Sequence, residues 1–94
     1  MILYFKDTKL GEVHDVSGEG MWMYGILKPE KEIEVFRDLF NDLIDEEGQF
    51  DETHYDKEWL ENENWYILDE NNRKRGIIVP AVYPDGAINW RWIF

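Results

Sequence analysis

The stretch PEKEIEVFRDLFNDLIDEEG (Pro29–Gly48) shows the three- and four-residue spacing of apolar positions that is typical of an amphipathic helix. The apolar positions are Ile33, Phe36, Phe40 and Leu43, with Leu39 and Ile44 widening the stripe. Proline is tolerated at the first position of a helix, and glycine commonly follows the last one. This segment therefore predicts a helix that begins at Pro29, ends before Gly48 and buries one apolar face.

Runs that are typical of β-strands flank this helix on both sides. They are Met1–Lys6, Leu10–Val16, Met21–Leu27, Asn64–Asp69, Arg75–Val82 and Ala87–Phe94, with Ser17–Gly20 as a loop. Met21–Leu27 is apolar enough to be a largely buried strand. Pro80 lacks a backbone N–H, so the run that contains it should form an edge strand or a bulge. In the last run, Ile88, Trp90, Trp92 and Phe94 should share one face, opposite Asn89 and Arg91.

A second, shorter helix is expected after Gly48. Asp51 could cap it, and Tyr55, Trp59 and Leu60 would then point inward. The resulting order, βββ-α(α)-βββ, predicts an α+β fold with an antiparallel sheet of five to six strands and one or two helices packed on one face.

Length and composition indicate a single folded domain that covers residues 1–94. Five Trp, five Tyr and five Phe can offset the entropy of ordering so short a chain. The absence of cysteine excludes disulfides and zinc sites built on thiolates, and it fits a cytoplasmic location. The sequence contains neither a recognisable secretion signal nor an apolar run long enough to span a bilayer.

The net charge of −11 lies in the middle of the chain. Residues 30–63 contain fourteen acidic and three basic residues, whereas the remaining residues contain seven of each. A chain so acidic repels the phosphate backbone, so nucleic-acid binding is not expected, although Arg73, Lys74 and Arg75 form a basic cluster.

No group of residues indicates catalysis, a metal or a cofactor. On a helix, Asp51, His54 and Glu58 would share a face, but two carboxylates and one imidazole are more typical of a solvated acidic surface than of a metal site. Ser17, the only serine, has no base near it in sequence. We therefore predict no catalytic residue, no metal and no cofactor.

The acidic middle segment favours a protein-binding module that presents an acidic, aromatic-containing helical face to a basic protein. The residues expected to contact this partner are Glu34, Asp38, Asp42, Asp45, Asp51, Glu52, Asp56 and Glu58, with Tyr55 and Trp59 as aromatic anchors. The most specific version is an inhibitor of the immunity or antitoxin type, because such proteins are often small, acidic and free of cysteine.

Two alternatives belong to other classes. In the first, the domain is an enzyme or ligand-binding domain whose pocket holds an anion at an arginine between aromatic rings. The pocket residues would be Trp22, Tyr24, Trp90, Arg91 and Trp92. In the second, the acidity serves only solubility, and the chain forms a homodimer along an edge strand.

Seven positions carry a family resemblance. They are Gly11, Asp15, Trp22, Gly25, Pro29, Trp90 and Arg91, within LGEVHDVSGEGMWMYGILKP (Leu10–Pro29) and the closing AINWRW, and the F-x-x-L-F pattern of VFRDLF (Val35–Phe40) adds to them. In this pattern the chain resembles a small bacterial α+β family of unknown function, although Met21 stands where that family is expected to have proline. The resemblance implies a fold and no activity.

Overall fold

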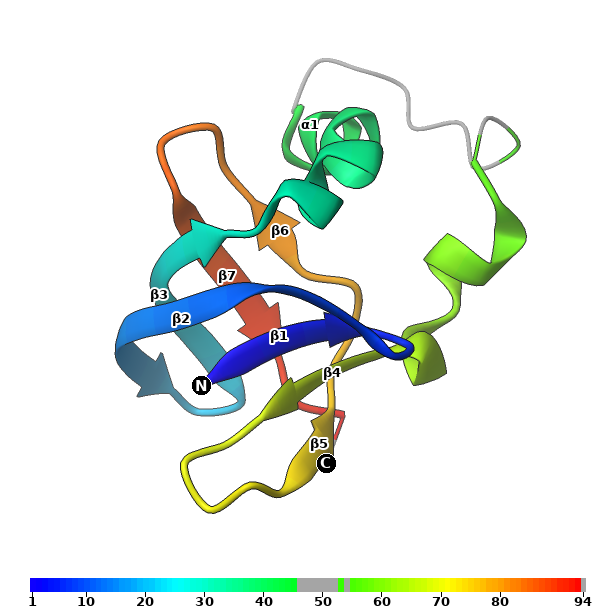
Figure 1. The fold of residues 1–94 in the computed structure, drawn as a ribbon. Coiled ribbons are helices and arrows are strands. Elements are labelled where there is room, and N and C mark those ends of the chain that lie inside the picture. Colours follow the sequence, from blue (N-terminus) through cyan, green and yellow to red (C-terminus); the bar gives the residue numbers. More distant parts are fainter. Residues whose placement is uncertain (46–52, 54, 94) are drawn as a thin grey trace.

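The structure, a computed structural model, describes residues 1–45, 53 and 55–93. The elements are β1 (Ile2–Phe5), β2 (Thr8–Glu19), β3 (Trp22–Pro29), the 3-10 helix η1 (Lys31–Phe36), α1 (Arg37–Ile44), the 3-10 helices η3 (Lys57–Leu60) and η4 (Asn62–Asn64), β4 (Trp65–Leu68), β5 (Lys74–Gly76), β6 (Ala81–Val82) and β7 (Ala87–Arg91). The fold is α+β, as predicted. All strands belong to one antiparallel sheet in the order β5-β4-β1-β2-β3-β7-β6, and this sheet curls beneath α1 (Figure 1).

The segment that follows β5 closes the curled sheet on itself. Ile77 forms an antiparallel bridge with Trp92, just beyond the end of β7. The backbone N–H of Ile77 also donates a hydrogen bond to the carbonyl of Trp65 in β4, at 3.3 Å, and that of Ile78 donates to Arg91, at 3.0 Å. Strands from opposite ends of the sheet order therefore meet here, and their inner side chains share one core.

The predicted strand Arg75–Val82 is two strands, so the sheet has seven strands among the described residues rather than five or six. The break falls at Val79 and Pro80, between β5 and β6. Pro80 has no N–H to donate, and the N–H of Val79 donates to the side-chain oxygen of Asn62, at 3.0 Å, instead of to a neighbouring strand.

The predicted loop Ser17–Gly20 was wrong, because β2 continues to Glu19 and only Gly20 and Met21 form the turn. β2 carries a bulge in which Asp15 and Val16 together lie opposite Gly25 of β3. Asp15 adopts a left-handed conformation, with φ of 54°. The bulge resets the alternation of β2 and allows it to pair with β3 beyond that point.

Gly11 is required where β2 crosses close to β3. A Cβ at this position would lie 2.5 Å from the carbonyl oxygen of Lys28 and 2.9 Å from Leu27 Cδ1. Since the nearest of these atoms belongs to the backbone of the paired strand, it cannot move aside without breaking the register.

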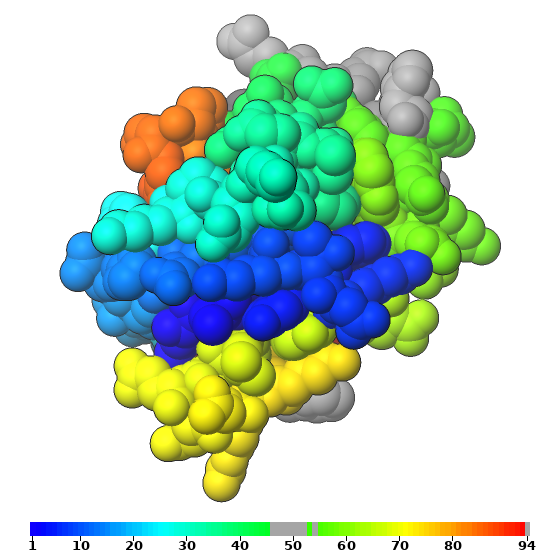
Figure 2. Space-filling view, viewed as in Figure 1, coloured from blue at the N-terminus to red at the C-terminus, as the bar shows by residue number. Residues whose placement is uncertain are grey.

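The helical segment starts later than predicted. β3 runs to Pro29, and the N–H of Glu30 donates to the carbonyl of Leu10, at 2.8 Å, which ties this end to β2. Lys31–Phe36 then forms a 3-10 helix, whose three-residue period brings Ile33 and Phe36 into the core. Figure 2 shows this segment, in cyan and green, lying along the blue β2 strand.

α1 contributes Leu39 and Phe40 to the core, both fully buried. Leu43, which we expected to be buried with them, is 38% exposed. The apolar stripe therefore ends about one turn earlier than its spacing predicts, because the part of α1 that packs on the core ends at Phe40.

Asp51, the expected cap of a second helix, lies outside the described residues. In the described part of this region, Asp56 caps the 3-10 helix η3 by accepting a hydrogen bond from the N–H of Glu58, at 3.0 Å. Tyr55, Trp59 and Leu60 pack against the core, as predicted, although they follow 3-10 turns and a bend rather than an α-helix.

Trp65, at the start of β4, is the centre of the core and is fully buried. Its ring centroid lies 5.0 Å from that of Phe5, 5.2 Å from that of Phe36 and 5.8 Å from that of Phe40. These distances fit edge-to-face or tilted aromatic pairs. One ring therefore joins β1, η1 and α1 to β4.

We expect Gly11→Ala to lower the free energy of unfolding by about 1–3 kcal/mol, since overpacking in a fixed backbone environment costs that much. Chemical denaturation of the purified variant measures this loss. Gly76→Ala is the matched control, because its nearest atom would be Ile93 Cδ1, the flexible end of a side chain, at 3.2 Å. An equal loss in both variants would show that the approach of β2 to β3 is not the constraint.

Candidate functional site

Four acidic side chains of the helical segment are exposed, as predicted. We call Glu34, Asp38, Asp42 and Asp45 the acidic face. Arg37 lies beside it, and its Nε donates to Glu34 Oε1 at 3.4 Å. An ion pair this exposed contributes little to stability.

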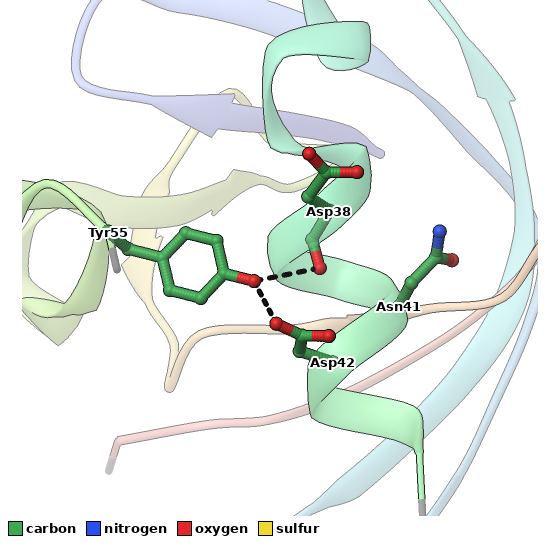
Figure 3. Close-up of a pocket in the computed structure, with 4 residues that line it drawn as sticks. All are labelled: Asp38, Asn41, Asp42 and Tyr55. Carbon is green, nitrogen blue, oxygen red and sulfur yellow. Dashed lines mark hydrogen bonds between the residues drawn. The ribbon is translucent and has the colours of Figure 1, made fainter. Parts of the chain in front are cut away.

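Tyr55 connects the later part of the chain to the acidic face (Figure 3). Its hydroxyl donates to the carboxylate of Asp42 and also lies 3.2 Å from the carbonyl oxygen of Asp38. Together with Asn41, these residues line a hollow of about 440 Å³. The hydrogen bond to Asp42, and then burial, raise the pKa of Tyr55 to about 12.

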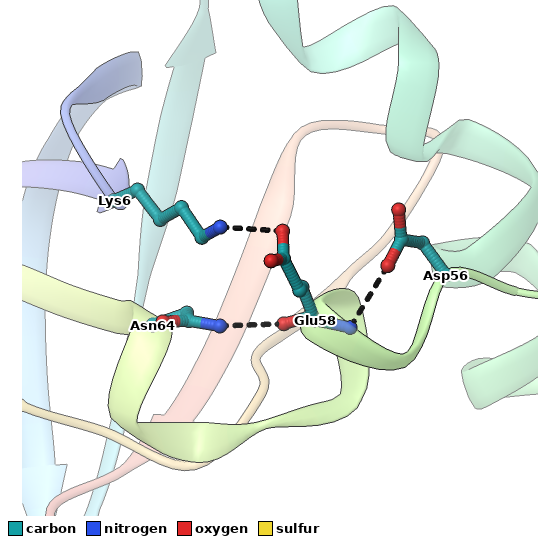
Figure 4. A network of polar contacts seen from close by, with 4 residues as sticks. All are labelled: Lys6, Asp56, Glu58 and Asn64. Carbon is teal, nitrogen blue, oxygen red and sulfur yellow. Dashed lines mark hydrogen bonds and ion pairs between the residues drawn. The ribbon is translucent and has the colours of Figure 1, made fainter.

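A second polar network joins the turn between β1 and β2 to η3 and η4 (Figure 4). Lys6 forms an ion pair with Glu58, whose carbonyl accepts a hydrogen bond from Asn64 Nδ2 at 2.9 Å. The hydrogen bond with Glu58 raises the pKa of Lys6. Asp56 accepts the N–H of Glu58 at the start of η3. Glu58 and Asp56, both predicted as partner contacts, are thus engaged within the domain.

Trp59, predicted as an anchor for a partner, is also engaged internally. Its ring centroid lies 4.8 Å from that of Phe36, and its carbonyl accepts the indole N–H of Trp65 at 2.8 Å. Of the predicted contacts, the structure brings Asp38, Asp42 and Tyr55 together. Asp51 and Glu52, as well as His54, lie outside the described residues.

The alternative pocket around Arg91 is not assembled. Trp90 and Trp92 are buried on the inner side of the sheet, 1% and 7% exposed, and contact each other edge to face. Trp22, Tyr24 and Arg91 lie exposed on the outer side. The predicted alternation of the last strand is confirmed for Ile88, Trp90 and Trp92. It separates Arg91 from the two tryptophans, and Phe94 lies outside the described residues.

Arg75 occupies the place that we expected for Arg91. Its guanidinium carbon lies 3.9 Å from the centroid of the Trp92 ring, and both residues line a hollow of about 180 Å³ at the end of the sheet. Sequence spacing could not reveal this contact, because it arises from the closure at Ile77 and Trp92.

The outer side of β3 and β7 is an apolar surface that the sequence analysis missed. Trp22, Tyr24 and Ile26 are 51%, 40% and 46% exposed. We call these residues, together with Ile78 and Arg91, the β3–β7 face. The prediction that Met21–Leu27 is largely buried was therefore wrong. The alternation of large side chains at positions 22, 24 and 26 is the signal that could have identified an exposed side.

Comparisons with protein-family models, with curated protein sequences and with solved structures gave no match. In the part of the chain that the structure describes, no helix is long and apolar enough to cross a membrane. Across those same residues, no three His, Asp or Glu side chains are grouped so that they could hold a metal ion.

Replacing Asp42 with Asn should lower the pKa of Tyr55 from about 12 towards its ordinary value of 10.0, because the carboxylate that holds its proton is removed. A pH titration of the Tyr55 ring resonances by NMR measures this change. Glu34→Gln is the control. Glu34 belongs to the same acidic face but does not contact Tyr55, so its replacement should leave the pKa of Tyr55 at about 12.

The same contact should make stability depend on alkaline pH. Since the folded state raises the pKa of Tyr55, the contribution is complete below about pH 10 and is lost as the pH rises through about 12. The difference in stability between the wild type and Asp42→Asn should therefore shrink over that interval. A difference that stays constant there would contradict the assigned hydrogen bond.

Proposed function

We propose that this domain is a protein-binding module that presents its acidic face to a basic protein. The observation that carries this proposal is the display of carboxylates on a segment whose other side is fixed in the core by Ile33, Phe36 and Phe40. Among the described residues, no Lys or Arg pairs with Asp38 or Asp42. Two lysines near the helical segment are engaged with other carboxylates, because Lys6 pairs with Glu58 and Lys9 with Glu12 and Glu30.

The distribution of charge supports this function. Residues 30–63 carry the whole net charge of −11, so the field of the molecule is concentrated on one segment. A face of a single sign raises the rate at which an oppositely charged partner associates and disfavours partners of like charge. Such steering weakens beyond about 10 Å at moderate ionic strength, so the partner's basic residues have to approach this face directly.

The most specific form of the proposal is an inhibitor of the immunity or antitoxin type that covers a basic nuclease-like toxin. Small size, the absence of cysteine and the excess of acidic residues support it. The anionic-ligand alternative has less support, because Trp90 and Trp92 lie inside the sheet and Arg91 outside it. The remaining alternative, acidity that serves only solubility, requires an experiment that separates position from net charge.

That experiment compares two double variants with the same total charge. Glu34→Lys with Asp38→Lys changes the acidic face, whereas Asp7→Lys with Glu70→Lys, the sheet variant, changes exposed positions in two turns that join strands of the sheet. A synthetic peptide rich in Lys and Arg serves as the probe, and its counterpart with Gln at those positions is the control peptide. Calorimetry at low and high salt measures binding, and thermal unfolding confirms that each variant is folded.

We expect the wild type and the sheet variant to bind the basic peptide with similar affinity, whereas the acidic-face variant loses roughly tenfold or more. Binding should weaken as salt is added. Equal losses in the two double variants would show that only the net charge acts, which supports the solubility alternative. Binding of the Gln peptide as tightly as the basic peptide would rule out the electrostatic proposal.

A further inference from the structure

The β3–β7 face is an apolar surface that the acidic-face proposal does not use. Trp22, Tyr24 and Ile26 occupy three successive outward positions of β3 and are each at least 40% exposed. Ile78, 37% exposed, lies next to Arg91 through a backbone hydrogen bond of 3.0 Å. Exposed Trp and Tyr with a neighbouring Arg are the residue types enriched where proteins bind one another.

The strand register places opposite charges on the two sides of Trp22. Glu19 of β2 pairs with Trp22 on one side, and Arg91 of β7 pairs with it on the other. Both charged side chains are exposed, and paired residues of an antiparallel sheet point to the same side. Glu19, Trp22 and Arg91 therefore form a row of acid, tryptophan and base across the neighbouring strands β2, β3 and β7.

We propose that the β3–β7 face binds a second copy of this chain and forms a two-fold symmetric dimer. A two-fold axis that runs along β3 in the plane of contact brings Trp22 of the two copies together. The same rotation places Glu19 of each copy opposite Arg91 of the other, so the ion pair forms twice. An arbitrary apolar patch would not have this complementarity with itself.

The position of the face also separates the acidic residues of the two copies. The turn that joins β2 to β3 lies at the opposite side of the molecule from α1 (Figure 1). Contact around Trp22, close to this turn, therefore leaves the two acidic faces pointing outward. Each face stays open, and the dimer offers two of them, which would strengthen binding to a partner with two basic sites.

The exposed area of the β3–β7 face limits the affinity that we expect for the dimer. Aromatic side chains present about 150–250 Å² when fully exposed, so the partly exposed residues of this face offer on the order of 500 Å² per copy. A dimer would bury about 1,000 Å² in total, at the lower end of specific interfaces. We therefore expect a dissociation constant of about micromolar or weaker, which calls for measurements over a wide range of concentrations.

Analytical ultracentrifugation of the full chain tests the proposal. The mass should rise from 11.4 kDa towards twice that value as the concentration increases. Trp22→Ser should reduce the dimer strongly without affecting the fold, because this side chain is 51% exposed in the monomer. Leu43→Ser, which changes an apolar residue 38% exposed on α1, is the control and should dimerise normally.

A charge exchange tests the two-fold arrangement itself. Glu19→Arg alone and Arg91→Glu alone should each weaken the dimer at least tenfold, because like charges would then meet twice. The double variant should recover the wild-type constant. Mixing the two single variants should produce heterodimers that are stronger than either homodimer, because one chain then carries two bases in this row and the other two acids.

The response to added salt distinguishes dimer formation at the β3–β7 face from peptide binding at the acidic face. Added salt weakens binding of the basic peptide, but it screens the repulsion between two chains of charge −11 and should not weaken the dimer in the same way. A chain that stays monomeric at all accessible concentrations would overturn the inference, and so would a dimer unaffected by Trp22→Ser and by both charge variants. Neither result would bear on peptide binding at the acidic face.

Discussion

The buried ring of Trp65 is the contact on which both layers of the fold depend. It lies against Phe5 of the sheet and against Phe36 and Phe40 of the helical layer, and its indole N–H donates to the carbonyl of Trp59. Its own carbonyl accepts the N–H of Ile77, where the sheet closes. One residue thus connects the helical segment, the turn at η3 and the closure of the sheet. The carbonyl of Trp59 thus satisfies the buried indole N–H of Trp65.

This aromatic centre explains why the acidic residues face solvent. Phe36 of η1 and Phe40 of α1 are held against Trp65, and the carboxylates of the acidic face point outward. The ion pairs of Lys6 and Lys9 lie at the junction of the two layers, and they are too exposed to position the helix by themselves. Packing of the aromatic rings therefore positions the helical layer, and the position of that layer determines where its carboxylates lie.

The spacing of apolar residues in the sequence was sufficient to predict those elements whose buried positions repeat with one period over several residues. The presence of strands on both sides of the helical segment, the inward side of β7 and the exposure of Glu34 and Asp38 agree with the prediction, whereas the number and the bounds of the strands differ from it. The failures lie where tertiary contacts override the local pattern. Residues 31–36 follow a three-residue period because Ile33 and Phe36 both enter the core, and the strand at Pro80 divides because Asn62 takes the N–H of Val79.

The candidate binding surfaces could also be predicted only where they depend on local spacing, and not where distant segments meet. Spacing identified the carboxylates of α1, but it could not show that Glu58 turns to Lys6 or that Trp59 packs on Phe36, since both contacts join distant segments. A strand of large side chains was interpreted as buried because periodicity does not reveal which side of a curled sheet receives the helical layer. Trp22 and Tyr24 lie on the side that no described element covers.

The bulge at Asp15 has a consequence for the behaviour of the chain at high concentration. β1 pairs with β2 only as far as Glu12, so beyond Val13 the outer edge of β2 has no neighbouring strand among the described residues. A long, flat edge of this kind invites strands of other molecules and growth into aggregates. The left-handed kink at Asp15 and the charge of Glu19 interrupt that edge, and both features disfavour open-ended β-sheet extension and amyloid-like stacking.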